Sequence, residues 1–447
     1  MRIRFKLAAI AVLVLLLTVP LLLIVSKIYE RDNYSDQARQ DIARSWTGAQ
    51  KLLGPILVVP YTRAYEKREF DDQLKRHVTN QYRVDEQLFL LPESLETNVE
   101  LNTEIRYRGI YEVPVYSSSI QLAGRFSARR ATELDQRPDV VDVGKPFLSI
   151  VVNDMRGIAE PPILGWSAGE VRFLPGSNLD FQSNGIHAPL EHLDKAAGST
   201  YRFKVSLALR GMSSFRFAPI GDANRTSIKS GWPHPGFEGL YLPSQREISS
   251  DGFTAYWQTS AFATNMNRKA NKCAVGDCAE FINSYSGVQL VDPVDVYLQA
   301  QRATKYAILF IGLTFTAFFL FEILKNLAIH PIQYGLVGLA LTVFYLLLIS
   351  LAEHIRFASA YAIATISCSG LLAYYISYVL GSVRRGLTFG MAIAGLYGVL
   401  YVIIQEEDFA FSMGAGLVFF ALSGVMYLTR KVDWFQIGKT NFSQKEK

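Results

Sequence analysis

The chain has 447 residues, half of them hydrophobic, and a formal net charge of +5 at pH 7. A chain of this length can hold about two or three domains. Beyond the short tail Gln444-Lys445-Glu446-Lys447 there is no block of Lys and Arg, which argues against a nucleic-acid partner. The hydrophobic excess lies in six long runs. These leave a segment of about 275 residues with ordinary globular composition, which is enough for a core.

The first apolar run, residues 7–25, follows the basic residues Arg2, Arg4 and Lys6. A basic head of this kind could begin a secretory signal peptide. However, the apolar stretch is longer than the core of about 7–15 residues in such a peptide, and no Ala-x-Ala cleavage pattern follows it. We therefore expect an uncleaved membrane anchor over residues 1–27.

Residues 28–53 have the spacing of an amphipathic helix. Apolar side chains recur at intervals of three and four, at Ala38, Ile42, Trp46, Ala49 and Leu53. Gly54-Pro55 is expected to end the helix. On this face Trp46 is interpreted as a packing residue rather than a platform for a ligand.

From Pro55 onward the apolar period changes to two. Residues 56–59 predict a short buried strand, and residues 201–209 alternate almost perfectly between apolar and polar side chains. The pattern predicts a large, mainly-β, antiparallel domain over residues 28–302. The polar stretch 131–143 predicts a loop or a boundary, so both one large sandwich and two modules stay open.

The segment 230–239, Ser-Gly-Trp-Pro-His-Pro-Gly-Phe-Glu-Gly, predicts a rigid, extended loop, because two prolines fix φ and the glycines permit tight turns. Trp232, His234 and Phe237 are its candidate binding residues, with the aromatic rings gripping an acyl or sugar face. The alternative is that the rings hold the loop on the next strand. His234 has no nearby pattern of carboxylate and nucleophile, so we do not expect it to be catalytic.

Three cysteines have different expected roles. Cys273 and Cys278 flank Ala-Val-Gly-Asp, and an oxidising compartment would favour a disulfide between them. A zinc site is not expected, because zinc requires about four ligands and no further Cys or His is near in sequence. Cys368 is interpreted as a small packing residue inside an apolar run.

The last third of the chain contains five apolar runs, at residues 304–324, 333–352, 358–380, 387–404 and 409–428. Each is close to the length of about 20 residues with which an α-helix crosses a bilayer. With the anchor they predict six transmembrane helices. The basic clusters at the ends of these runs predict cytoplasmic termini, and they leave residues 26–302 outside the membrane on the opposite side.

Charged side chains are sparse within these runs. Glu322 lies one turn before Lys325, which predicts a pair at the membrane interface. Glu353 and His354 follow the third predicted span and are, with Glu322, the candidate polar sites of the membrane region. Small residues at Gly386, Gly390, Ala394 and Gly398 predict a close helix–helix contact. Ala360, Ala364 and Cys368 repeat the pattern.

No phosphate-binding loop, HExxH, GxSxG or paired CxxC motif is present in the sequence. We therefore expect a protein that is not an enzyme and has no cofactor. The expected domains are the anchor 1–27, the external domain 28–302, a five-helix bundle 303–430 and a cytoplasmic tail 431–447.

Three groups of residues share a pattern with a known family. They are Glu30-Arg31 with Trp46-Thr47-Gly48-Ala49-Gln50 and Gly54-Pro55-Ile56-Leu57-Val58-Val59-Pro60-Tyr61; Trp232-Pro233-His234-Pro235-Gly236-Phe237 with Gly252-Phe253-Thr254-Ala255-Tyr256-Trp257; and His330-Pro331-Ile332-Gln333-Tyr334 with Leu351-Ala352-Glu353-His354. Together they resemble the CreD family of inner-membrane, cell-envelope integrity proteins over nearly the whole chain. Gly236 is a departure, since serine is expected there.

The resemblance implies an inner-membrane protein linked to envelope stress, produced under a two-component system that also bears on the β-lactam response. It implies no established reaction. We expect non-enzymatic binding of an envelope lipid, glycan or protein by the periplasmic domain, with membrane lipids around the bundle. The alternative is a transporter or lipid-handling protein in which Glu322, Glu353 or His354 lines a cavity.

Overall fold

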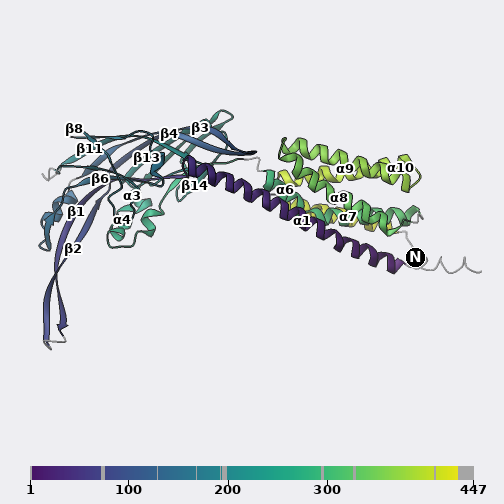
Figure 1. Ribbon diagram of the computed structural model, residues 1–447, viewed down its shortest axis with the longest axis horizontal. Coiled ribbons are helices and arrows are strands. Elements are labelled where there is room, and N and C mark those ends of the chain that lie inside the picture. The colour runs from purple at the N-terminus through teal and green to yellow at the C-terminus, as the bar shows by residue number, and fades with distance from the viewer. Residues whose placement is uncertain are drawn as a thin grey trace, which may run out of the picture. The chain divides into compact units, whose positions relative to one another are not determined.

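The computed structural model describes residues 3–71, 76–127, 129–167, 169–191, 193, 199–292, 296–325, 329–406 and 409–430. The chain forms two compact units (Figure 1). We call Gln37–Pro293 the β unit, and Met1–Asp36 with Val294–Lys447 the membrane unit. Helix α1 (Ile3–Ser45) contributes residues to both units.

The β unit consists of two sheets. The first has nine strands: β14 (Pro235–Gly239), β17 (Ser286–Leu290), β12 (Ser214–Phe217), β1 (Gln50–Asp71), β6 (Phe147–Val152), β10 (Gly185–Pro189) and β9 (Leu174–Pro175) in spatial order, with β2 (Arg76–Leu90) and β5 (Val140–Val143) also paired to β1. The second has eight: β15 (Gln245–Ser249), β16 (Gly252–Ser260), β13 (Ala223–Ser230), β3 (Ser94–Arg108), β4 (Tyr111–Ser127), β11 (Thr200–Met212), β7 (Ile163–Trp166) and β8 (Gly169–Arg172).

Strand pairing in these sheets is antiparallel except between β1 and β12 and between β3 and β13. The expected antiparallel β architecture is thus confirmed. In β11 every second residue from Tyr201 to Leu209 is buried, as the alternation predicts. Strands β1 and β2 also form a long hairpin that extends beyond the sheets (Figure 1).

One hydrophobic core joins the two sheets. The Phe217 ring on β12 meets the Trp257 ring on β16 edge to face, with centroids 5.3 Å apart. Tyr116 on β4 meets Phe215 on β12 in the same way, at 6.4 Å. Edge-to-face contacts of this kind add to the free energy gained by burying the rings. A single cluster of buried side chains runs from Leu52 to Leu290, so the sandwich is one module.

Two predictions for the β unit are right only in part. The helix expected over residues 28–53 is the second half of α1 and ends at Ser45; β1 begins at Gln50, where the chain pairs with Phe215. The side-chain amide of Gln50 donates a hydrogen bond to the Arg210 carbonyl at 2.9 Å. Contacts with residues far along the chain therefore favour a strand at Gln50, although the local apolar spacing is that of a helix. The stretch 131–143 is not a boundary, because it contains part of α2 (Arg129–Asp135) and all of β5.

The C-terminal end of α1 is held by one arginine. The Arg156 guanidinium donates to the carbonyl oxygens of Ala43 at 3.1 Å and Arg44 at 2.5 Å, and to the Asp154 carboxylate at 2.6 Å. A cation at this end satisfies open carbonyls and complements the helix dipole. Trp46 follows directly, and the guanidinium of Arg106 lies 3.7 Å from its ring centroid.

We expect Asp154→Asn to weaken the β unit modestly at pH 7, since a charge-assisted hydrogen-bonded pair that solvent partly screens is lost. The Arg156 guanidinium lowers the pKa of Asp154 below its ordinary value of 3.8. The stabilisation is therefore complete above that value and is lost as pH falls through the folded-state pKa. Thermal unfolding of both proteins from pH 7 to pH 3 should show the difference shrinking below about pH 4. A difference independent of pH would contradict the assignment.

The membrane unit contains the apolar helices. After α6 (Val296–Lys305) come α7 (Ala307–Lys325), α8 (Pro331–Ala352), α9 (Phe357–Val379), α10 (Val383–Gln405) and α11 (Ala410–Thr429). Among the described residues, five helices are long and apolar enough to cross a membrane, or six if the bent pair α6–α7 forms one span. That pair is bent by 43°, whereas the sequence predicted one uninterrupted run over 304–324.

The predicted ridge of small residues is confirmed in its first half. A Cβ added at Gly390 would lie 2.5 Å from the Ala373 Cβ on α9, so α9 and α10 touch there. Gly386 is equally close to α9, 2.6 Å from the Ala373 carbonyl oxygen. At Gly398 the same added atom meets nothing within 4 Å. The ridge therefore does not continue to Gly398.

Candidate functional site

The segment predicted as a loop over residues 230–239 ends in an edge strand. Residues Pro235–Gly239 form β14, paired antiparallel to β17. The Trp232 indole N–H donates to the Val291 carbonyl at 2.9 Å. The Phe237 ring packs against Phe253 and Trp257, each at 5.9 Å. Of the three candidates only His234 is exposed, so the two aromatic rings hold the strand on the core.

Strands β14, β17, β12 and β1 are neighbours in the first sheet. The face of these strands opposite to Phe237 carries a row of charged side chains. Lys51 on β1 lies beside Arg216 on β12, and Arg216 pairs with Gly287 on β17, which pairs with Glu238 on β14. Gly287 has no side chain, and an added Cβ would lie 2.2 Å from a backbone oxygen. Arg216 therefore reaches across β17 to Glu238, forming two hydrogen bonds of 2.7 and 3.1 Å. We call Lys51, Arg216, Glu238 and Tyr285 the charged row.

The ring of Tyr285 contacts both cations of the row. Its ring centroid lies 4.8 Å from the Lys51 ammonium and 5.0 Å from the Arg216 guanidinium. The Lys51 ammonium donates to the Ile282 carbonyl. Burial, and next the neighbouring Arg216, lower the pKa of Lys51. All four side chains of the row are half-buried. The row carries two positive charges and one negative charge, which leaves one cation without a carboxylate within the described residues.

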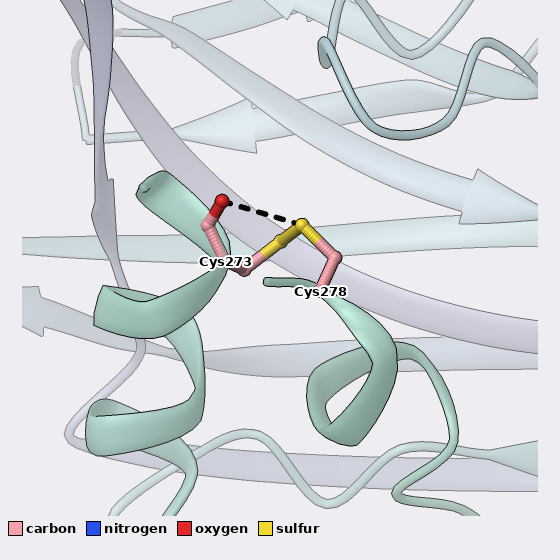
Figure 2. Close-up of a disulfide and its surroundings, with 2 residues drawn as sticks. All are labelled: Cys273 and Cys278. Atoms are coloured by element: carbon pink, nitrogen blue, oxygen red, sulfur yellow. Dashed lines mark hydrogen bonds between the residues drawn. A yellow bond between two sulfur atoms is a disulfide. The ribbon is translucent and has the colours of Figure 1, made fainter. Parts of the chain in front are cut away.

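A disulfide joins Cys273 and Cys278 (Figure 2). It joins α4 (Met266–Ala274) to the start of α5 (Ala279–Ile282), the helix whose last carbonyl accepts Lys51. The Cys273 side chain and Phe281 are buried. The link therefore fixes the backbone that positions Ile282 and the following Tyr285.

Replacing Cys273 and Cys278 by serine should destabilise the β unit by about 2 kcal/mol, the loop-closure value for so short a ring. A reductant should lower the melting temperature of the unmodified protein to the same extent. The same reductant should leave the double variant unchanged, which provides the control. Equal melting temperatures of the two proteins without reductant would contradict the prediction.

In the membrane unit Glu322 forms an ion pair with Lys6 on α1. The predicted pair with Lys325 stays a prediction, because the Lys325 side chain lies outside the described residues. The Tyr334 hydroxyl donates to the second carboxylate oxygen at 2.8 Å. Lys6 also donates to the Ile329 carbonyl at 2.7 Å. The pair is buried, with 12% and 10% of the two side chains exposed.

The other two membrane candidates lie apart from Glu322 in sequence. Glu353 forms an ion pair with Arg31 on α1 at 3.3 Å, and its own side chain is only 8% exposed. His354 is exposed and its ring nitrogen lies 3.2 Å from the Ser350 carbonyl oxygen. Two grooves on helices α8, α9 and α10 are lined by other residues. Among the described residues no three His, Cys, Asp or Glu side chains are placed to hold a metal.

Sequence reasoning missed the charged row because its members are far apart in the chain. Lys51 was assigned to the helix over residues 28–53, and Arg216 was not singled out. Glu238 stood in the predicted loop without a partner. One available signal was Gly287, because a glycine inside a strand often marks the close approach of another group.

The profile of the family described as inner membrane protein CreD matches residues 2–435. The chain belongs to the CreD family. It is 36% identical over 423 residues to the inner membrane protein CreD of Escherichia coli (strain K12), an alignment covering 94% of this chain and 91% of that protein. The expected family is thus confirmed, and CreD-family membership makes the apolar helices those of an inner-membrane protein.

One solved structure illustrates a remote resemblance to the chain. An M1 zinc metallopeptidase from Deinococcus radiodurans is 8% identical, with 38% of each chain covered and a TM-score of 0.17. A likeness this weak supports no conclusion about the fold or chemistry of the CreD-family chain.

Proposed function

We propose that this CreD-family protein supports cell-envelope integrity by non-enzymatic binding of an envelope component to its β unit, which lies in the periplasm. The binding surface is the charged row together with the exposed His234 on the adjoining segment. The topology that places both termini in the cytoplasm belongs to the same proposal.

The observation that carries the proposal is the surplus cation of the charged row. Lys51 is half-buried beside Arg216, and among the described residues no carboxylate is paired with it. Burying a cation beside a second cation is unfavourable unless another group compensates. A negatively charged group of an envelope ligand would compensate both cations. The row is rigid, because Arg216 is held by Glu238 and Lys51 by Ile282.

The test is a Lys51→Met variant in a strain whose own copy of the gene is deleted. Methionine keeps the length and apolar stem of lysine but removes its charge. We expect envelope-stress survival to fall at least tenfold, because a charged hydrogen bond to a ligand is worth about that much or more in affinity. Lys51→Arg should retain most of the survival, since the positive charge stays.

Lys229→Met is the matched control, because Lys229 is exposed on β13 and lies outside the charged row. Membrane level and melting temperature of each variant are measured beside survival. Full survival with Lys51→Met at a normal membrane level would overturn the proposed surface. Survival lost equally in Lys51→Met and Lys229→Met would do the same.

A further inference from the structure

The turn between α9 and α10 in the membrane unit carries a groove of about 600 Å³. Helix α9 ends at Val379, and Gly381 has φ = 60°, a conformation that turns the chain at little cost only in glycine. The groove is lined by Tyr374, Ser377, Tyr378, Val383 and Leu387, among others. Its wall is mostly apolar.

Two tyrosines form one side of this groove. Tyr374 and Tyr378 are 65% and 74% exposed, and their rings meet edge to face with centroids 5.1 Å apart. Tyrosine combines an apolar ring with a hydroxyl that needs a polar partner, so it is enriched where a membrane meets water. The groove therefore lies at a depth where an acyl chain and a lipid headgroup meet.

Two arginines come directly after the groove-lining Val383 in the chain. Arg384 and Arg385 lie in the first turn of α10 (Val383–Gln405), and both are exposed. Within the described ranges neither guanidinium has an acidic partner. Positive charges in the first turn of a helix oppose the helix dipole, and an anion at the same place would relieve both effects.

We propose that this groove binds an anionic phospholipid, with an acyl chain against Tyr374, Tyr378 and Leu387 and the headgroup phosphate at Arg384 and Arg385. The occupant follows from charge complementarity and from the bilayer that an inner-membrane protein spans. Basic pockets between membrane helices recognise anionic headgroups in this way. The site is independent of the charged row, which belongs to the β unit.

The alternative role for Arg384 and Arg385 is to orient the helices in the membrane by their charge. That role requires the charges and does not involve the groove. A variant that fills the groove and keeps both arginines therefore separates the two roles. Leu387→Trp does this, because Leu387 is 56% exposed and lines the groove.

The experiment is native mass spectrometry of the full chain released from nanodiscs that contain equal amounts of phosphatidylglycerol and phosphatidylethanolamine. We expect the unmodified protein to retain phosphatidylglycerol preferentially. Since each basic residue contributes about fivefold to anionic lipid binding, Arg384→Gln with Arg385→Gln should lower that retention at least tenfold. Leu387→Trp should lower it as well. Arg430→Gln, which removes a cation lying on the Tyr427 ring, is the matched control and should leave it unchanged.

Equal retention of the two lipids by the unmodified protein would overturn the proposal. So would unchanged retention in Leu387→Trp, because charge alone would then explain the binding. A drop in Arg430→Gln equal to that in the double variant would show non-specific attraction. Size-exclusion profiles and circular dichroism of every variant confirm that folded protein is compared, and the Arg384→Gln, Arg385→Gln pair still tests the site if Leu387→Trp fails to fold.

Discussion

Glu322→Leu is expected to destabilise the membrane unit by about 3–5 kcal/mol, because Lys6 is then left buried without its counter-charge. The pair joins α1 to α7, two helices separated by about three hundred positions in the chain. Tyr334 loses its acceptor in the same variant, which adds the cost of an unpaired buried hydroxyl. The measurement is thermal unfolding of the purified protein in detergent.

The double variant Lys6→Met, Glu322→Leu should be more stable than either single variant. Removing both charges eliminates the unpaired ion, and well-packed apolar side chains can replace a buried ion pair at little cost. The coupling energy comes from the four proteins of the double-mutant cycle. Lys27→Met is the control, since Lys27 and Glu30 form a solvent-exposed pair that contributes little to stability. A silent Glu322→Leu variant would contradict the account of this pair.

Gly390→Leu is also expected to disrupt the membrane unit. The first carbon of the new side chain would already lie 2.5 Å from the Ala373 Cβ and 3.0 Å from the Ser369 carbonyl oxygen. Both are on α9, one of them is backbone, and so the two helices must separate. Overpacking of a close contact costs about 1–3 kcal/mol and sometimes more. We expect loss of folded, monodisperse protein on size-exclusion chromatography.

Gly398→Leu is the matched control on the same helix. The space around Gly398 is open, and leucine favours a helix over glycine, so the variant should be as stable as the unmodified protein or slightly more stable. If both variants behave alike, the closeness of α9 and α10 at Gly390 is not what holds them together.

The sequence predicted both the membrane helices and the β-strands, because each has a clear pattern of apolar residues. The runs of about twenty apolar residues form helices in the structure. The two-residue alternation of β11 forms a strand with one buried face. Both patterns are predictive because they reflect burial directly. The boundary at residues 46–53 could not be predicted in the same way. Helical spacing continues through Trp46 and Leu53, and only the pairing of Gln50 with Phe215, far along the chain, decides for a strand.

Contacts between side chains that are far apart in the sequence could not be predicted either. Lys325 is the near cation for Glu322 in sequence, and nothing in the local pattern points to the ion pair with Lys6 on the first helix. The charged row needs the strand order of the sheet, in which Gly287 lies between Arg216 and Glu238. Local patterns carry no record of that order. The family resemblance did carry the identity of the chain, because the Trp232–Pro233 and His330–Pro331 motifs are specific.

The most direct test of the binding proposal is mass spectrometry of the gently purified full chain and of its Lys51→Met variant, prepared in parallel. The account predicts a defined, negatively charged envelope component that stays bound to the unmodified protein and is lost from Lys51→Met, while Lys229→Met retains it. The same component bound equally to all three proteins, or none bound to the unmodified protein, would contradict the assignment of function to the charged row.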